Sequence, residues 1–496
     1  MDIKNVWLIL YSVVLILLAL YSLHICILVI LSWWHRKDSV QKTPLPDDLP
    51  MVTIQLPVYN ERYVIKRLID SVCSLDYPAD KMHIQVLDDS DDITKDISRQ
   101  IVAEYKEKGF DIEHIHRDVR FEFKAGALKQ ALATAKGEFI AIFDSDFTPP
   151  KDFLKSLLVY FSSEKIGMVQ ARWTHINPNH SILTKVQAMM LDIHFLVEQP
   201  ARFYAGCFIN FNGTAGIWKK QCIIDAGNWS GETVSEDMDL SYRAQMKGWK
   251  FIYAHDVLVP AELPIYVSAF KSQQYRWAQG TFQCAKKHTW ALLSSKMEFF
   301  KKIQAIIHLT NYLSYPLLFL WGVVLLPVSI GFNRIHPNIS LIHIITIYVV
   351  AIGNPLLACL YARSCSTPGG RHRVSWTLHN IKLLPAFLFV NCGMCINNTF
   401  AILKTIFTNQ KPVFIRTPKF GIEKKTRFIP SDYSVPYNKI IFIEIILGCF
   451  CLWKAIYFAI NGAIYTSPFF LIYSVGFFYM AGMEILHRPH RKQEVV

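Results

Sequence analysis

Two aspartates one residue apart, Asp144 and Asp146, directly follow the apolar run Phe139–Phe143 and precede a Pro-Pro turn. Alternate side chains of an extended backbone point to the same side, so the two carboxylates are expected to be neighbours. Carboxylates that close repel one another, and a hard divalent cation bound to a polyphosphate relieves the repulsion. A solvated turn after a strand explains many isolated pairs of this kind, so a metal site here needs support from other residues.

Four further stretches carry groups that could act on a phosphorylated substrate. Lys124 opens a predicted helix just before the apolar run, and a Lys at a helix amino terminus suits a phosphate. Asn210–Thr214 is a polar turn, and Ser235–Asp239 begins a helix with acidic residues that could simply complement the helix dipole. Gln273–Trp277 lies on a basic, aromatic helix, where Arg and Trp could equally anchor a membrane interface. Each stretch is a weak signal alone.

Strand-like and helix-like segments alternate between residues 51 and about 250, which predicts an α/β domain with a largely parallel sheet. The expected strands are Val52–Leu56, Ile84–Leu87, Ile112–His116, Phe139–Phe143 and Met168–Ala171. In such sheets ligands bind beyond the carboxyl ends of the strands. Polar groups follow three of these ends, namely Tyr59-Asn60-Glu61, Asp88-Asp89 and the Asp144–Asp146 pair, so the sequence predicts a site there.

Composition indicates a membrane protein. Hydrophobic residues make up 52% of the chain and gather in long runs. The net charge of +13 could suggest nucleic acid, but the basic residues lie beside the apolar runs, which favours cytoplasmic loops and membrane lipid headgroups over a nucleic-acid partner. The eleven cysteines show neither a disulfide framework nor a zinc spacing, and the first apolar run is too long for a cleavable signal peptide.

Five apolar runs are expected to span the membrane: Val6–Trp34, about Ile303–Phe332, Leu341–Tyr361, about Ile440–Ile460 and about Pro468–Leu486. Ser375–Phe407 is ambiguous, because its apolar core is short and basic loops flank it on both sides. An interfacial helix keeps both loops in the cytoplasm, whereas a sixth span would put one of them outside. We therefore expect five spans, with the amino terminus outside and the α/β domain in the cytoplasm.

Together these residues resemble the motifs of the membrane-integrated family 2 glycosyltransferases, the group that contains cellulose, mannan and hyaluronan synthases. The order of motifs is D-D, D-x-D, (T/S)-E-D and Q-x-x-R-W, present here as Asp88-Asp89, Asp144-Ser145-Asp146, Ser235-Glu236-Asp237 and Gln273–Trp277. Phe414–Lys419 resembles the gating loop of that group. The phrases QVLDDS, QARW and FNGTAG look closest to its mannan-synthase-like and glucan-synthase-like branch.

The resemblance implies an α/β GT-A-type glycosyltransferase domain inserted between transmembrane helices, with a helical membrane domain and amphipathic interfacial helices. The expected divisions are a transmembrane helix at 1–37, the GT-A domain at 51–262, interfacial helices carrying Q-x-x-R-W at 263–300, a transmembrane hairpin at 301–362, an interfacial helix at 375–407, a gating-like loop at 411–425 and a transmembrane hairpin at 438–487.

The resemblance also implies roles at the donor end. Asp146, aided by Asp144, would hold Mg²⁺ or Mn²⁺ against the diphosphate of a nucleotide sugar, and Lys124 would add a positive charge. The nucleotide base and the ribose would contact residues that follow the first two strands, namely Tyr59, Glu61, Asp88 and Asp89.

At the acceptor end, Asp237 is the candidate base that takes the proton of the acceptor hydroxyl, with Glu236 beside it. Gln273 and Trp277 would shape the acceptor site, and Arg276 would place a cation near the diphosphate. Direct displacement inverts the anomeric centre, so an α-linked donor would give a β-linked product.

These roles predict a processive β-glycan synthase that transfers a hexose from a nucleotide sugar to a growing polysaccharide and moves the product across the membrane. The alternative transferase adds a single sugar to a membrane lipid, and a non-catalytic membrane subunit is disfavoured because every proposed catalytic position keeps a competent side chain. The motifs do not separate UDP-glucose from GDP-mannose as the donor. We expect no cyclic-dinucleotide regulatory domain in this chain, and the membrane could be a plasma membrane or an endomembrane.

Overall fold

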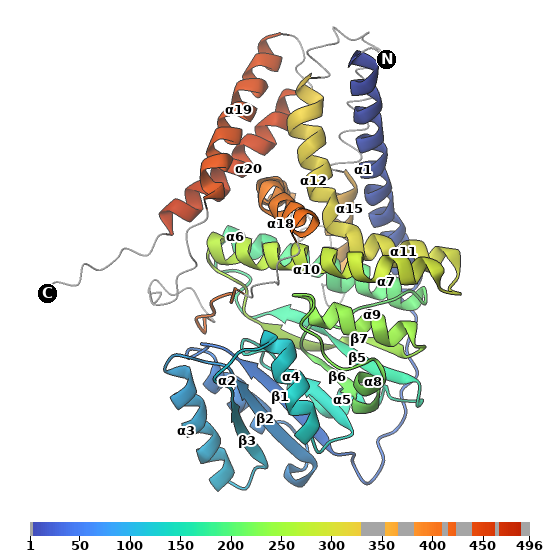
Figure 1. The fold of residues 1–496 in the computed structure, drawn as a ribbon, viewed down its shortest axis with the longest axis vertical. Helices are drawn as coiled ribbons and strands as arrows, with labels where there is room; N and C mark the ends of the chain where they lie inside the picture. Colours follow the sequence, from blue (N-terminus) through green and yellow to red (C-terminus); the bar gives the residue numbers. More distant parts are fainter. Residues whose placement is uncertain are drawn as a thin grey trace, which may run out of the picture.

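A sheet domain lies at one end of the molecule and long helices extend from the other end (Figure 1). The structure is a computed structural model that describes residues 3–328, 353–365, 381–408, 415–422, 439–461 and 466–487. Between the sheet and the long helices, a layer of helices runs across the long axis of the molecule.

Seven strands form one mixed sheet in the order β3-β2-β1-β4-β6-β5-β7. They are β1 (Val52–Val58), β2 (Met82–Asp88), β3 (Ile112–His116), β4 (Phe139–Ile142), β5 (Ile166–His175), β6 (Gly216–Lys219) and β7 (Lys250–Ala261). β1 pairs in parallel with β2 and β4, whereas β6 runs antiparallel between β4 and β5. The expected largely parallel α/β sheet is confirmed, and β6 and β7 are additions that the sequence reading did not contain.

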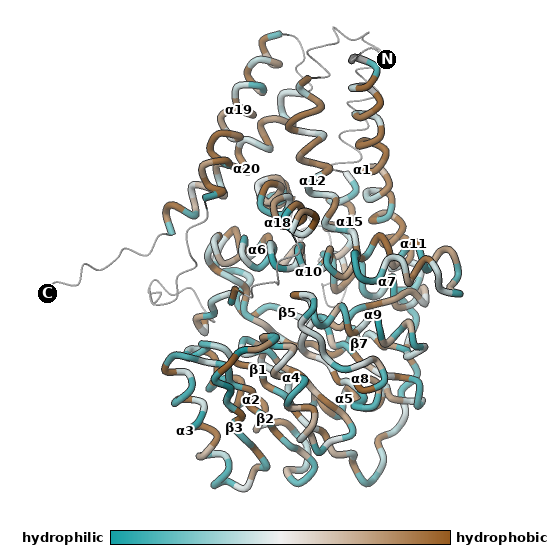
Figure 2. Tube along the Cα trace, in the orientation of Figure 1, coloured by the Kyte–Doolittle hydropathy of each residue, from teal (hydrophilic) through white to brown (hydrophobic). Residues whose placement is uncertain are grey.

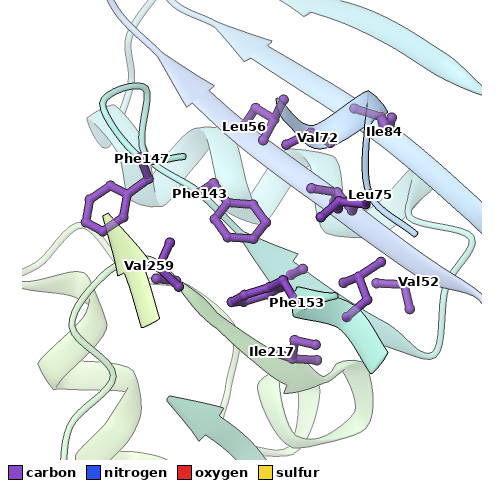
Figure 3. Packing of buried hydrophobic residues seen from close by; sticks show 14 of the residues in the cluster. Val52, Leu56, Val72, Leu75, Ile84, Phe143, Phe147, Phe153, Ile217 and Val259 are labelled. Atoms are coloured by element: carbon purple, nitrogen blue, oxygen red, sulfur yellow. The ribbon is translucent and has the colours of Figure 1, made fainter. Parts of the chain in front are cut away.

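Alternating side chains of the strands build a core on each face of the sheet. Phe143 follows β4 and packs edge to face on Phe153 of α5 (Phe153–Leu158), with Leu56 and Val72 in the same cluster (Figure 3). α2 (Ile65–Cys73) covers this face because its apolar residues recur at helical spacing, and α3 (Thr94–Glu107) lies beside it. On the other face, α4 (Phe123–Thr134) packs with Ile140 of β4. Two buried faces hold the carboxyl ends of β1 and β4 rigidly in place.

A layer of helices connects the sheet with the long helices. They include α6 (Ile182–Ile193), η2 (His194–Glu198), α7 (Gln199–Tyr204), α9 (Glu236–Met246), α10 (Val267–Ser294) and α11 (Phe299–Thr310), whereas α8 (Lys220–Asp225) packs against β5 and β6 of the sheet. α6 begins at a capping box in which Ser181 and Thr184 exchange hydrogen bonds. α10 contacts α9 and α11 as well as α18 (Cys395–Phe407) and α20 (Ser467–Leu486), so it connects the sheet domain with the membrane helices.

The long helices form the apolar end of the molecule (Figure 2). They include α1 (Ile3–Trp34), α12 (Ser314–Phe319) continued by η4 (Leu320–Leu325), α15 (Asn354–Cys365), α17 (Leu384–Gly393), α18 (Cys395–Phe407), α19 (Ile440–Ile460) and α20 (Ser467–Leu486). Side chains of α1 such as Ile16 and Leu23 are more than half exposed, as expected of a surface that faces lipid.

Five helices among the described residues are long and apolar enough to cross a membrane: Asn5–Trp34, Phe299–Val328, Leu384–Phe407, Ile440–Ile460 and Ser467–Leu486. Leu384–Phe407 belongs to the segment expected at the interface, and in Figure 1 its α18 part is seen nearly end-on while α1 and α19 run along the long axis. Most of the expected span Leu341–Tyr361 lies outside the described residues. The number of spans and their orientation stay predictions.

Candidate active site

A cavity of about 200 Å³ opens beyond the carboxyl ends of β1 and β4. Every residue to which the resemblance assigned a role, with the exception of Asp88, lines this cavity. These residues are Tyr59, Glu61, Asp89, Lys124, Asp144, Asp146, Glu236, Asp237, Gln273, Arg276 and Trp277. Residues more than 200 positions apart in the chain therefore meet at the strand edge where the sequence predicted a site.

The end of β4 places Asp144 beside Lys124. The backbone N–H of Asp144 donates to Thr214 Oγ1 at 2.9 Å, while Lys124 Nζ contacts Asp144 Oδ1 and donates to the carbonyl oxygen of Gly213 at 2.9 Å. Burial alone would lower the pKa of Lys124, but Asp144 and Glu236 raise it above its ordinary value. Lys124 is therefore a fixed positive charge in the cavity.

Glu236 and Asp237 form the first turn of α9, directly after Ser235. Burial, followed by the repulsion of Glu236, raises the pKa of Asp237 to about 7, and burial also raises the pKa of Glu236. A backbone hydrogen bond from Met238 N to Asp237 Oδ1 at 2.8 Å fixes the carboxylate. A carboxylate with a pKa near neutrality is suited to accept a proton from a hydroxyl group.

Gly213 allows the polar turn after Asn212 to approach Asp237. Its φ is +80°, a backbone conformation that favours glycine, and a Cβ atom here would lie 3.1 Å from Asp237 Oδ2. The sequence singled out this turn as a weak signal. The structure gives the turn a definite place, because it contributes both a carbonyl group to Lys124 and space beside the candidate base.

α10 presents Gln273, Arg276 and Trp277 to the cavity. Burial lowers the pKa of Arg276, whereas the carboxylates of Glu236 and Asp144 act in the opposite direction. α10 comes close enough because residue 280 is glycine, where a Cβ would lie 2.1 Å from Ser235 Oγ. Gly280 therefore sets how near the helix lies to the candidate base.

Asp144 and Asp146 meet the requirements of a divalent cation held jointly with a substrate. Among the described residues, no group of three or more His, Cys, Asp and Glu side chains is placed to hold a metal ion by itself. Mg²⁺ is commonly bound by one or two carboxylates together with substrate phosphates, and a pair of carboxylates beside Lys124 fits that arrangement.

Residues 415–422 lie against the cavity and belong to the segment that resembles a gating loop. Lys419 Nζ donates to Asp146 Oδ2 at 2.7 Å and to the backbone carbonyl of Glu262. The Glu262 carboxylate in turn accepts hydrogen bonds from the backbone N–H groups of Phe420 and Gly421, both at 2.9 Å. Residues 411–414 and 423–425 of the expected loop lie outside the described residues.

Asp88 and Asp89 face different surroundings, although they are adjacent in the chain. Asp89 lines the cavity and pairs with the guanidinium group of Arg117, with distances of 2.7 and 2.5 Å. Asp88 is fully buried, accepts from Ser90 N at 2.8 Å and lies 2.9 Å from His114 Nε2. The structure does not bring Asp88 to the cavity wall, because neighbouring residues at the end of a strand point to opposite sides.

Tyr59 carries a stacked cation at the outer end of the cavity. The guanidinium carbon of Arg120 lies 3.3 Å from the centre of the Tyr59 ring. Arg120 lines the cavity as well, so this end offers a flat, layered surface. The sequence reading missed Arg117 and Arg120, although two Arg residues shortly before a predicted phosphate-binding Lys were a usable signal.

Two further cavities continue from the first towards the membrane helices. A cavity of about 350 Å³ shares Asp237, Gln273 and Trp277 with the first, and its walls include polar side chains of η2 and α7. A third, more apolar cavity of about 280 Å³ shares Tyr21 and Tyr315 with the second. The candidate base therefore stands where the first two cavities adjoin.

The chain has extensive similarity to known proteins. Residues 50–280 match the model of a protein family described as "Glycosyltransferase like family 2". Glucomannan 4-beta-mannosyltransferase 1 of Cyamopsis tetragonoloba is 34% identical over 464 residues, covering 90% of this chain and 84% of that protein. Glucomannan 4-beta-mannosyltransferase 7 of Arabidopsis thaliana is 30% identical over 458 residues, covering 90% and 78%. The chain belongs to glycosyltransferase family 2.

The fold agrees with this family assignment. A solved structure, "Mannosyltransferase PcManGT from Pyrobaculum calidifontis in complex with GDP-Man and Mn2+", matches 79% of this chain and 99% of its own with a TM-score of 0.50 and 19% identity. The expected GT-A-type sheet is confirmed. In this family 2 chain, the four motifs named from the sequence meet around one cavity, with Asp89 representing the first of them.

Proposed function

We propose that this family 2 chain is an inverting, divalent-metal-dependent hexosyltransferase that extends a β-linked polysaccharide and guides the product towards the membrane. The carrying observation is that Asp237, Gln273 and Trp277 lie on the wall common to the first two cavities. A donor held in the first cavity and an acceptor in the second would therefore meet at the candidate base. The relatives are named mannosyltransferases, so we favour mannose as the transferred hexose.

The donor end is a binding site for a nucleoside diphosphate sugar. Tyr59 and Arg120 offer a flat surface on which the nucleotide base can stack, and Asp89 offers a carboxylate to the ribose hydroxyls. Lys124 and Arg276 place two cations beside the carboxylates of Asp144 and Asp146. When bound, Mg²⁺ or Mn²⁺ would neutralise the diphosphate leaving group.

Proton transfer falls to the first turn of α9. Asp237 takes the proton of the acceptor hydroxyl as the new C–O bond forms at the anomeric carbon, while the bond to the diphosphate oxygen breaks on the opposite side. A base in this position contributes a factor of about 10²–10⁴ to the rate. Burial, and then the repulsion of Glu236, keep the pKa of Asp237 high enough for that proton to be accepted near neutral pH.

The acceptor end fits a carbohydrate chain. Trp277 offers a flat apolar surface to a sugar ring, and η2 lines the second cavity with hydrogen-bonding groups. His194 bridges Asn212 at 3.0 Å and Glu198 at 3.1 Å, so the polar wall is held in a fixed arrangement for sugar hydroxyls. The third cavity continues this route among the long helices, which is where a translocated polymer would leave.

The decisive experiment supplies membranes containing the full chain with labelled GDP-mannose and, separately, with labelled UDP-glucose, in the presence of Mn²⁺ or Mg²⁺. We expect a long, β-linked product on a sizing column, and none from the Asp237→Asn variant. If the only product is short and extractable into lipid solvent, the chain is a glycolipid synthase and the polymer proposal is wrong. Full activity of the Asp237→Asn variant would show that Asp237 is not the catalytic base.

A further inference from the structure

Three charged side chains meet where the membrane helices contact α10. Lys271 Nζ lies 2.8 Å from Glu444 Oε1 of α19 and 2.7 Å from Glu484 Oε2 of α20. The exposed fractions of the three side chains are 2%, 0% and 5%. We call Lys271, Glu444 and Glu484 the positioning cluster. Its two carboxylates and single ammonium group are enclosed at a depth where most of the surrounding sequence is apolar.

The backbone of Lys271 adds a third connection. Its carbonyl oxygen accepts a hydrogen bond from Asn397 Nδ2 of α18 at 3.0 Å, and Asn397 and Asn398 are themselves buried. One residue of α10 is therefore joined to α18, α19 and α20, which come from segments more than a hundred residues away. The α19–α20 pair packs together extensively, so an anchor on both helices is an anchor on the hairpin.

Stability does not account for such a cluster. Removing charges from water costs several kcal/mol per ion, and well-packed apolar side chains of similar size often stabilise as much or more. Here one ammonium group serves two carboxylates, and no described residue donates a hydrogen bond with good geometry to either oxygen of Glu444. Ionisable groups inside membrane domains generally have a functional role, and in some proteins buried ionic groups fix one arrangement of the elements that they join.

The arrangement that the cluster specifies is that of α10. At 3.6 residues per turn, Gln273 is displaced about 160° and Trp277 about 120° around the helix from Lys271. The membrane helices therefore hold one side of α10, while the other side forms the wall between donor and acceptor cavities. A helix that turned or slid at Lys271 would carry Trp277 and Arg276 with it, since a helix moves as a rigid rod over so short a distance.

We propose that the positioning cluster sets the register of α10 against the C-terminal hairpin, and thereby the position of the acceptor relative to Asp237. Lys271, Glu444 and Glu484 are positioning residues, because they act through Gln273 and Trp277 and do not touch the reacting atoms. The inference rests on the proposed glycosyl transfer, which supplies the reaction whose acceptor is positioned.

The first test compares Lys271→Met with Lys286→Met in the full chain. Lys286 is the matched control, because it also lies on α10 and reaches α18 through the carbonyl of Thr405, but its side chain is exposed. We expect Lys271→Met to keep the donor KM and the slow hydrolysis of the donor, while transfer to the polymer falls by about 10²-fold, the effect of a misplacement of about 1 Å. Hydrogen exchange of residues 267–281 should rise in Lys271→Met and not in Lys286→Met.

Two further variants keep the test informative if Lys271→Met does not fold. Exchanging Lys271→Glu with Glu444→Lys preserves the charges of the cluster and should restore transfer and product length. The uncharged triple variant Lys271→Met, Glu444→Gln and Glu484→Gln should fold, keep donor hydrolysis and make short product. Wild-type product length from the triple variant, or from Lys271→Met, would overturn the proposal.

Failure of the proposed function is distinguishable from failure of this inference. If the wild-type chain forms no product from any nucleotide sugar, the transferase assignment fails, and the hydrogen-exchange comparison still reports whether the cluster holds α10. If wild-type product forms and the exchange pattern of residues 267–281 is the same in all variants, the transferase assignment stands and the positioning role is wrong.

Discussion

The ammonium group of Lys419 lies 2.7 Å from Oδ2 of Asp146, although 273 residues separate them in the chain. The same carboxylate is the proposed metal ligand, so Lys419 and a divalent cation would compete for its two oxygens. Glu262 stabilises this arrangement by accepting two backbone N–H groups of the Lys419 segment. The segment at residues 415–422 and the proposed metal site would therefore be coupled through Asp146.

This coupling predicts a change in metal affinity. Replacing Lys419 by Met removes the competing cation, so the Kd for Mn²⁺ in the absence of nucleotide should fall by about tenfold, equivalent to about 1.4 kcal/mol. Electron paramagnetic resonance of Mn²⁺ measures free and bound metal directly. Lys151→Met, at an exposed position in the turn after Pro150, is the control and should bind as wild type does. Equal affinity in both variants would show that Lys419 does not compete.

Metal removal gives a second prediction. Treatment with a chelator should abolish transfer, and Mn²⁺ or Mg²⁺ should restore it, because Asp144 and Asp146 provide too few ligands to hold a metal tightly without substrate phosphates. Asp146→Asn should raise the Mn²⁺ concentration needed for half-maximal transfer. Full activity after exhaustive chelation would contradict metal dependence.

The predictable part of the site came from local rules. Asp144 and Asp146 both line the cavity, as expected, but β4 ends at Ile142 and the two residues lie in a turn in which the Phe147 N–H donates to the carbonyl oxygen of Asp144 at 3.1 Å, so the alternation of an extended strand is not what brings them together. Residues at the ends of parallel strands meet at one edge whatever their separation in sequence, and this rule placed Tyr59 and Asp89 correctly.

Other relationships needed the folded chain. The contact of Lys419 with Asp146 is a long-range pairing without a periodic signal, and β6 is a four-residue strand whose antiparallel pairing depends on its neighbours. The same holds for Lys271, although one signal was available: Glu444 and Glu484 are acidic residues within predicted membrane spans, and such residues need a partner.

The raised pKa of Asp237 predicts the pH dependence of transfer. The base must be ionised to accept a proton, and the pKa of Asp237 is about 7, so kcat/KM should rise with pH and level off above that value. The measurement is initial transfer rate at saturating Mn²⁺ across about pH 5.5–8.5. A rate independent of pH over that range would contradict the assignment.

Asp237→Asn supplies the control for folding. When a carboxyl group has a higher pKa in the folded state than in the unfolded state, the folded protein loses stability as the pH rises from the unfolded pKa through the folded pKa. Since Asn carries no such charge, the variant should have a Tm at pH 7.5 that equals or exceeds that of the wild type while transfer is lost. A lowered Tm would attribute the lost activity to misfolding.

Trp277 gives a prediction that separates donor from acceptor. Trp277→Ala removes a flat surface between the first two cavities, so transfer to polymer should fall by about two- to tenfold while the donor KM stays unchanged. Trp277→Phe retains an aromatic face and should recover most of the loss. Product length and donor KM, measured together, distinguish this outcome from damage to the donor site.

Gly280 predicts how closely α10 must approach α9. A Cβ at this position would lie 2.1 Å from Ser235 Oγ, so Gly280→Ala forces α10 away from the first turn that carries Asp237. Overpacking of this kind costs about 1–3 kcal/mol of stability. We expect a lower Tm and a loss of transfer larger than the loss of stability explains. Gly482→Ala in α20 is the matched control, since no atom lies within 4 Å of its added Cβ, and it should be neutral or stabilising. Adding Ser235→Ala to Gly280→Ala removes the nearest clashing atom and should recover part of both losses, whereas no recovery would place the constraint elsewhere on α10.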